Sequence, residues 1–334
     1  MARVPTTLLV DPVAESVTPP LDLLRQATAL RHQGFDPKLY RGIPHESWPE
    51  PSEVIFTTVF SWHYHQLETA ITTARKLWPY ARLKLSGVLA RRMGPAIGSR
   101  LGVSVFNGSI EASLDELRPD YSLVPEWDAS ILITSKGVCP RECAHCDASW
   151  RRKRVTRLID AWPKHLDIRL PRVEVWDNTL MLTPRGHYER LADTLVAFER
   201  PVDMVCGITP TGVPNQELIW RIERLQGLHL APLRLECNVI QDLDRLRKLW
   251  SVAQKTFSDA TDVRAFAVIN GDEGPLEASR RLEQIEAEGL QVDPIVFTPH
   301  DWLSSETYIH KVRGWTKSDI HACIERWPSA CNEL

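Results

Sequence analysis

The sequence lacks the features that mark several protein classes. Its 334 residues contain no apolar run near the roughly 18 residues needed to cross a bilayer. The apolar stretch before Asp11 is too short for a secretion signal, so we expect a soluble, cytoplasmic protein that does not bind membranes. A formal net charge of -3 gives no overall attraction to nucleic acid or anionic lipid. A hydrophobic content of 43% with 25% charged residues excludes a disordered or fibrous chain.

Cysteine is absent before Cys139, and the total of seven is odd, which does not indicate a disulfide framework in a chain without a secretion signal. Three cysteines fall close together in a Cys-x3-Cys-x2-Cys pattern: Cys139, Cys143 and Cys146. The other four stand apart and are expected to be buried or idle thiols rather than ligands of a second cluster: Cys206, Cys237, Cys323 and Cys331.

From residue 129 onward, short β-rich runs alternate with amphipathic helical patterns. Six runs are predicted to be strands: Ile131–Thr134, Val173–Trp176, Val202–Cys206, Leu233–Cys237, Val263–Ile269 and Ile295–Phe297. Helical periodicity begins at Asn215, the expected N-cap, and recurs from Ala278 to Ile285. This order predicts an α/β fold over residues 129–300, a partial (β/α)6 TIM-like barrel whose chemistry lies at the carboxyl ends of its strands.

Residues 1–128 alternate strands and helices at other spacings and predict a separate doubly wound, flavodoxin-like domain, followed by a linker at Pro119 and Pro125. Its predicted elements are Thr6–Val10, Leu21–His32, Lys38–Arg41, Val54–Val59, Leu67–Leu77, Arg82–Leu85 and Ser104–Phe106. Residues 301–334 form a predicted helical tail with a last helix capped by Ser318. Three tryptophans of this tail either pack a closing helix or stack on a substrate base: Trp302, Trp315 and Trp327.

The cysteine triad follows the first predicted barrel strand directly. Three thiolates without a fourth cysteine leave one coordination position open, which suits a four-iron, four-sulfur (4Fe-4S) cluster. Zinc fits less well, because a structural zinc site requires four protein ligands. His145 lies between two of the cysteines, where it could hardly complete the same tetrahedron. A zinc-stabilised, non-catalytic binding module is the alternative from another class.

The triad and its position resemble the radical S-adenosylmethionine (SAM) superfamily. The resemblance implies that Cys139, Cys143 and Cys146 hold a 4Fe-4S cluster whose unligated iron binds SAM. It further implies reductive cleavage of SAM to a 5'-deoxyadenosyl radical, with an electron from an external reductant of the flavodoxin or ferredoxin type. The radical abstracts a substrate hydrogen atom. The catalytic residues that face the substrate are unknown from the sequence.

The resemblance also implies contacts to SAM from three further positions. His145, which precedes the third cysteine, matches the place of an aromatic residue near the adenine. Asp177 or Asn178, after the second predicted strand, matches the place of the residue that holds the methionyl amino group. This stretch lacks the glycines that the family usually has, which leaves open which of the two makes the contact.

The fourth predicted strand alternates apolar and polar residues, so that Arg234, Glu236 and Asn238 share one face. Charged residues on an inward strand face need a partner or a ligand. The resemblance implies a ribose contact from Glu236 or Asn238, and an internal ion pair between Glu236 and Arg234 is the alternative.

The N-terminal domain is similar to the cobalamin-binding-like domain of one branch of the superfamily. The loop from Asp11 to Ser16 contains no histidine to ligate cobalt, and Ser86-Gly87 stands where a double glycine is often found. We therefore expect that this chain does not bind cobalamin.

A basic run follows the cysteines and comprises Arg151, Arg152, Lys153, Arg154 and Arg157. It is either a solvated face or a rim that binds phosphates. The second interpretation predicts rearrangement, as in an isomerase, or C-H functionalisation of a phosphate-bearing substrate such as a modified nucleotide in DNA or RNA. The alternative substrate is a small metabolite or natural-product intermediate, with cobalamin-dependent methyl transfer among the reactions.

Overall fold

The structure is a computed structural model that describes residues 6–15, 18–58, 63–87, 89–90, 94–106, 113–136, 157–177, 179–208, 212–257, 262–271, 273–296 and 313–328. These residues form two compact units, the first ending at Trp127 and the second beginning at Asp128. Within the described ranges, no helix is long and apolar enough to span a membrane.

The first unit is built on one parallel sheet in the order β2-β1-β3-β4-β5. Its strands are β1 (Thr7–Asp11), β2 (Lys38–Arg41), β3 (Glu53–Phe56), β4 (Arg82–Leu85) and β5 (Ser104–Val105). The order is that of flavodoxin-like folds, in which the chain reverses its direction of winding between β1 and β3. The predicted doubly wound fold is therefore confirmed.

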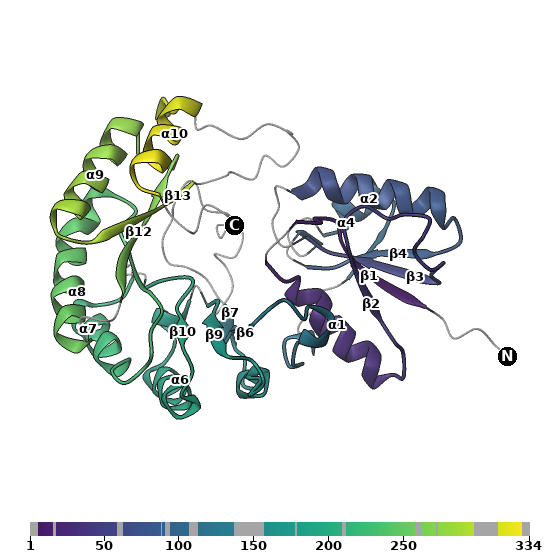
Figure 1. Cartoon of the computed structure of the whole chain (residues 1–334), viewed down its shortest axis with the longest axis horizontal. Coiled ribbons are helices and arrows are strands. Elements are labelled where there is room, and N and C mark those ends of the chain that lie inside the picture. Colours follow the sequence, from purple (N-terminus) through teal and green to yellow (C-terminus); the bar gives the residue numbers. More distant parts are fainter. Residues whose placement is uncertain are drawn as a thin grey trace. The chain divides into compact units, whose positions relative to one another are not determined.

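Helices cover both faces of this sheet because successive strand side chains point to opposite sides. Leu8 and Val10 pack against α2 (Tyr64–Leu77) and α4 (Pro95–Leu101), whereas Leu9 packs against α1 (Leu21–His32). Figure 1 shows α1 and α2 on opposite faces of the sheet.

The second unit contains six parallel strands that follow one another in chain order. They are β6 (Ala129–Leu132), β9 (Arg172–Val175), β10 (Val202–Asp203), β11 (Leu233–Glu236), β12 (Val263–Ile269) and β13 (Gln291–Val296). The sheets β6-β9-β10 and β11-β12-β13 are linked by a parallel bridge between Ile208 and Leu235. Since β6 and β13 do not pair within the described ranges, the barrel is partial and open, as predicted.

Helices line the outer side of these strands, as Figure 1 shows. They are α6 (Arg185–Phe198), α7 (Asn215–Arg224), α8 (Leu243–Thr256) and α9 (Pro275–Ala287). Their leucines and isoleucines form one core with Val173, Leu235 and Ala265 from the strands. Each such leucine contributes about 1.5–3 kcal/mol by its burial. The predicted N-cap at α7 is wrong by one position, because Pro214 precedes the first turn and Asn215 accepts a hydrogen bond from Arg245 at 2.8 Å.

The inner face of the strands carries ion pairs, although barrel interiors are usually filled by apolar side chains. Arg234 of β11 pairs with Asp203 of β10 and, at 3.8 Å, with Asp293 of β13, which also lies 3.4 Å from Arg264 of β12. Burial raises the pKa of Asp203, and the positive charge of Arg234 opposes the rise. Asp293 also interrupts the apolar pattern of β13, which explains why the sequence predicted that strand too late and too short.

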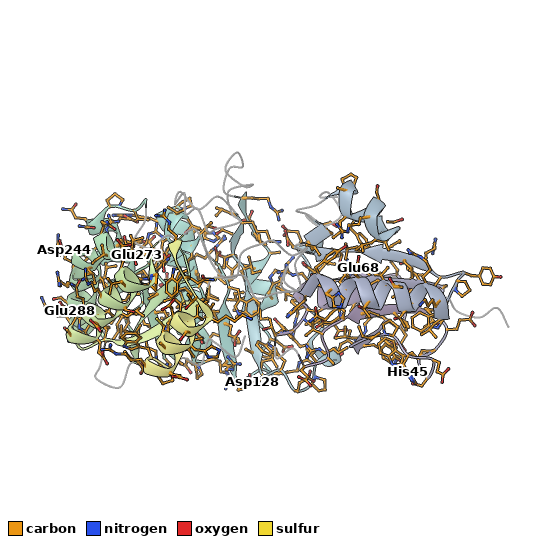
Figure 2. The ribbon with its side chains drawn as sticks, turned by 90° about the horizontal axis from the view of Figure 1, so that it is seen from above. His45, Glu68, Asp128, Asp244, Glu273 and Glu288 are labelled. Atoms are coloured by element: carbon orange, nitrogen blue, oxygen red, sulfur yellow. The ribbon has the colours of Figure 1, made fainter. Side chains whose placement is uncertain are left out.

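The tail forms α10 (Lys317–Arg326), which packs on α9. Thr316 caps this helix by accepting a hydrogen bond from the Asp319 N–H, so the predicted cap at Ser318 is wrong by two positions. Trp315 is buried and donates to the carbonyl of Glu273, which is labelled in Figure 2. Trp327 is buried as well, so both tryptophans have a packing role, and Trp302 lies outside the described residues.

The described ranges also contain two short strands and four 3-10 helices. They are β7 (Ser135–Lys136), β8 (Arg157–Leu158), η2 (Tyr121–Leu123), η4 (Trp162–His165), η5 (Leu180–Leu182) and η6 (Ile240–Asp242).

Candidate active site

The structure describes part of the predicted site. Asp177, Glu236, Asn238 and Arg157 are described. The remaining predicted residues lie outside the described residues and stay predictions: Cys139, Cys143, Cys146, His145, Asn178, Arg151, Arg152, Lys153 and Arg154.

The cysteine-bearing segment is joined to the barrel by a short two-stranded stem. β7 continues from β6 after two residues and pairs antiparallel with β8, in the register Ser135 to Leu158 and Lys136 to Arg157. The N–H of Ile159 also donates to the Thr134 carbonyl at 2.9 Å. The two ends of residues 137–156 therefore start from adjacent positions. Arg157, predicted as part of a basic rim, is exposed and lies on this stem.

Asp177 follows β9 and binds the stem. Its Oδ2 accepts hydrogen bonds from the N–H and hydroxyl of Thr134 at 3.0 and 2.8 Å, and from the N–H of Ser135 at 2.6 Å. Its Oδ1 accepts from the Ser135 hydroxyl at 2.8 Å and from the Thr179 N–H at 3.0 Å. The residue is 4% exposed. A buried carboxylate needs such donors, and here they come from both the stem and the turn after β9.

His187, in the first turn of α6, extends this set of hydrogen bonds. Its Nε2 lies 3.0 Å from the Thr134 hydroxyl oxygen. Because that hydroxyl donates its proton to Asp177, the Nε2 of His187 must carry the proton that it shares with Thr134. Burial lowers the pKa of His187, and the charge of Arg190 adds to this effect. A neutral imidazole therefore supports the stem from the helix side.

Sequence reasoning identified Asp177 and missed its partners. Thr134, Ser135 and His187 form the group that meets it, and all are buried. A sequence signal existed in the two hydroxyl residues that directly follow an apolar strand, since such residues bind nearby polar groups. The contact between Asp177 and a SAM amino group is untested by the structure and competes with these hydrogen bonds.

Glu236 and Asn238 do lie together at the end of β11, as predicted from their shared face. The Asn238 amide donates to a carboxylate oxygen of Glu236, and its carbonyl oxygen accepts from the Val268 N–H at 2.9 Å. The pair is thereby fixed against β12. Arg234, two residues before Glu236 on the same face of β11, forms an ion pair with Asp203.

Arg281 of α9 holds the loops around this pair. Its side chain is fully buried and donates to the carbonyls of Cys237 and Val268 at 2.6 and 2.7 Å. It also binds Glu273 at 2.8 Å, and Glu273 accepts from the Ile240 N–H at 2.7 Å. The turns after β11 and β12 are therefore tied to one guanidinium, which fixes the position of Glu236 and Asn238.

The described isolated cysteines are free thiols, as predicted, and Cys331 lies outside the described residues. Burial raises the pKa of the Cys206 thiol to about 12, and the negative charge of Asp177 adds to the rise. A thiol with so high a pKa stays protonated at neutral pH. Within the described ranges, no group of histidine, cysteine or acidic residues could hold a metal ion.

A second polar group lies at the carboxyl edge of the N-terminal sheet, around the switch point between β1 and β3. Asp11, Thr58 and Ser86 are at most 2% exposed. Among the described residues the Thr58 and Ser86 hydroxyl oxygens have no hydrogen-bond partner, and the Asp11 Oδ2 has only an ion pair with the Arg41 Nε at 3.8 Å. Gly87 has a φ of +89°, and a Cβ there would lie 2.2 Å from the Thr57 hydroxyl oxygen. Unpaired buried polar atoms are costly and rare in native proteins, so this edge has the character of a ligand site.

The fold matches solved structures of radical SAM enzymes. The radical SAM methyltransferase TsrM from Kitasatospora setae, with tryptophan substrate and the SAM analogue aza-SAM bound, is 11% identical, with a TM-score of 0.65 over 89% of this chain and 75% of TsrM. The cobalamin-dependent SAM radical enzyme OxsB, with aqua-cobalamin and SAM bound, is 11% identical, with a TM-score of 0.50 over 84% of this chain.

This chain spans 51% of the length of OxsB. No family model matches the sequence, and no curated protein matches it. The resemblance to radical SAM enzymes indicated by the cysteine motif is thus confirmed for the fold. The expected absence of cobalamin has no support, since OxsB shares the fold and binds cobalamin.

Asp11 should make stability depend on pH. Burial raises its pKa from 3.8 to about 6, although the hydrogen bond from the Val13 N–H and the positive charge of Arg41 both lower it. A carboxyl group with a raised folded-state pKa stabilises the protein below pH 4, and this contribution is lost as the pH rises through 6. Asp11→Asn should therefore gain up to about 3 kcal/mol over the wild type between pH 4 and pH 8. Thermal unfolding at a series of pH values measures this difference.

The control is Asp36→Asn, because Asp36 is exposed and its pKa is lowered by Lys38. This variant should show no gain at high pH. A difference between Asp11→Asn and the wild type that does not change with pH would contradict the assignment.

Proposed function

We propose that this protein is a radical SAM enzyme. Cys139, Cys143 and Cys146 would hold a 4Fe-4S cluster through three thiolates, leaving one iron for SAM. When bound, the cluster supplies the electron for reductive cleavage of SAM to methionine and a 5'-deoxyadenosyl radical, which takes a hydrogen atom from the substrate. The reaction is either a rearrangement or a C-H functionalisation.

The observation that carries this proposal is the position of the stem. β7 and β8 join the cysteine-bearing segment to the carboxyl end of the first strand of a parallel partial barrel, the end at which barrel enzymes carry their chemistry. Three soft thiolates without a fourth cysteine fit an iron-sulfur cluster with one open position. The fold shared with TsrM supports the same conclusion.

The described residues suggest how SAM would be held. Glu236 keeps a carboxylate at the end of β11 whose position is fixed by Asn238, and we assign the ribose contact to this pair. We assign the methionyl amino contact to Asn178, because the oxygens of Asp177 already accept hydrogen bonds from the protein. His145 is proposed to lie beside the adenine.

An external one-electron reductant of the flavodoxin or ferredoxin type would supply the electron. No described group of side chains could bind a second metal centre within the chain to store it. Such reductants are cytoplasmic, and a reducing compartment also keeps the thiols of the triad free for iron. We therefore propose a cytoplasmic location.

The first proposed substrate class is phosphate-bearing, with a modified nucleotide in DNA or RNA as the main candidate. It rests on the basic run from Arg151 to Arg157, of which Arg157 is exposed on the stem beside the cysteine-bearing segment. Binding to nucleic acid that weakens steeply with added salt would distinguish this class from an uncharged small substrate.

The second proposed class is a small metabolite or natural-product intermediate, with methyl transfer that depends on cobalamin. The unpaired hydroxyls of Thr58 and Ser86 favour it, because a corrinoid carries amide groups that could satisfy them. The two matched enzymes point the same way, since TsrM is a methyltransferase with a tryptophan substrate and OxsB is cobalamin-dependent. No histidine of the described β1–α1 loop would ligate cobalt.

The radical SAM assignment predicts formation of 5'-deoxyadenosine. After anaerobic reconstitution with iron and sulfide, reduction and addition of SAM, the wild type should release 5'-deoxyadenosine, as measured by chromatography. Cys143→Ala should release none, because two thiolates cannot hold the cluster. The matched control is Cys323→Ala, which removes a buried thiol of α10 distant in sequence from the triad and should keep the activity.

The same preparation tests the non-catalytic alternative. Metal analysis that finds zinc in place of iron and sulfide would contradict the radical SAM assignment and favour a zinc-stabilised binding module. A wild type that binds the full cluster and still releases no 5'-deoxyadenosine would contradict it as well.

The N-terminal unit is predicted to bind cobalamin through its unpaired hydroxyls. Thr58→Val should weaken the binding of hydroxocobalamin roughly ten-fold, and it should raise the melting temperature of the free protein because an unsatisfied buried hydroxyl costs about 1–3 kcal/mol. Absorbance after gel filtration and thermal unfolding measure the two effects.

Thr28→Val is the control, since the Thr28 hydroxyl donates to the Arg118 carbonyl at 2.6 Å. This variant should lower the melting temperature and leave cobalamin binding unchanged. If the wild type binds no hydroxocobalamin, the second substrate class loses its cofactor and the proposal fails.

A further inference from the structure

We infer that Asp177 is a positioning residue for the cluster segment, and that it does not contact SAM. This inference rests on the proposed function, because it assigns a role toward the proposed cluster. It concerns three described parts of the chain that meet at one carboxylate: the stem, the turn after β9 and the first turn of α6.

The Asp177 carboxylate already accepts hydrogen bonds at its available positions. Two carboxylate oxygens offer about four lone-pair positions in total. The N–H groups and hydroxyls of Thr134, Ser135 and Thr179 lie 2.6 to 3.1 Å from these oxygens, and one proton of the Ser135 and Thr179 hydroxyls can be shared between the two hydroxyls, which are 2.8 Å apart. No acceptor position is left for an ammonium group of a ligand, and the side chain is buried.

Most of the donors to Asp177 belong to the stem. Thr134 and Ser135 are the residues through which the chain leaves β6 toward the cysteines, and Ser135 is also the first residue of β7. On the return side, Leu158 pairs with Ser135, and Ile159 donates to Thr134. Holding Thr134 and Ser135 therefore fixes both ends of the segment that carries the cysteine triad.

His187 supports the contact between Asp177 and the stem from a second direction. The N–H of His187 Nε2 donates to the Thr134 hydroxyl, whose own proton goes to Asp177. The His187 ring also contacts the buried Trp162 edge to face, with ring centroids 6.5 Å apart. The chain of groups from α6 through Thr134 to β9 orients the stem in the way that supporting residues orient the ligands of a metal.

The contacts at position 177 require a carboxylate. Only a carboxylate offers acceptors on both terminal atoms, whereas an amide turns one of them into a donor. In Asp177→Asn, an NH2 group would face N–H groups of the stem or of Thr179. The substitution keeps the size of the side chain and loses hydrogen bonds that hold the stem.

The experiment compares four variants after anaerobic reconstitution. Asp177→Asn removes the acceptor, Thr134→Val removes one hydroxyl donor, and Thr134→Ser keeps that hydroxyl. Asp293→Asn is the matched control, because Asp293 is 1% exposed and pairs with arginines away from the stem. Circular dichroism and thermal unfolding check that each variant folds.

The readouts are the rate at which a chelator removes iron, the midpoint potential of the cluster, and the affinity for SAM. Asp177→Asn and Thr134→Val should both lose iron roughly ten-fold faster than the wild type or more, with a shifted potential. Thr134→Ser should behave as the wild type. Asp293→Asn should lower the melting temperature and leave iron release unchanged.

Two results would overturn the inference. If Asp177→Asn keeps iron and potential while its affinity for SAM falls, and Thr134→Val changes neither, then Asp177 contacts SAM. If neither variant differs from the wild type in iron release or potential, Asp177 has no role in positioning. Failure of the proposed function is a separate result, because the wild type itself would then take up no cluster.

Discussion

One buried carboxylate connects the parts of the barrel that matter for the proposed chemistry. Asp177 accepts hydrogen bonds from the end of the first strand and from the turn after the second, and His187 reaches the same group from α6. Hydrogen bonds to a charged acceptor are among the strongest polar contacts of a protein. In a buried place they matter more, because a carboxylate without donors would keep the full cost of its desolvation. The stem that leads into the cysteine-bearing segment is therefore fixed by the barrel.

Two other charged groups of the barrel site, Arg281 and Glu236, are also held by hydrogen bonds within the protein. Arg281 ties the turns after β11 and β12, and Glu236 is positioned by Asn238. The N-terminal unit carries a second polar group at its switch point, where the Thr58 and Ser86 hydroxyl oxygens are buried and have no described hydrogen-bond partner.

Strand order and fold class could be predicted from the sequence, because apolar runs such as Val263–Ile269 and helical periodicities such as Ala278 to Ile285 report burial directly. The position of Asp177 was predictable as well, because it directly follows an apolar run. Its hydrogen-bond partners were not predictable. Thr134 and His187 lie 43 and 10 residues away in sequence, and hydroxyl and imidazole groups carry no periodic signal. Caps were displaced by one or two residues at Asn215 and Ser318, where several polar residues compete for the same turn.

A cluster in the cysteine segment with one iron open to SAM should give an electron paramagnetic resonance signal that responds to SAM. The spectrum of the reconstituted and reduced protein is recorded before and after addition of SAM. The g values should shift when SAM is added, because SAM would ligate the open iron. A signal that SAM leaves unchanged, or a protein that contains zinc and gives no signal, would rule out such a cluster.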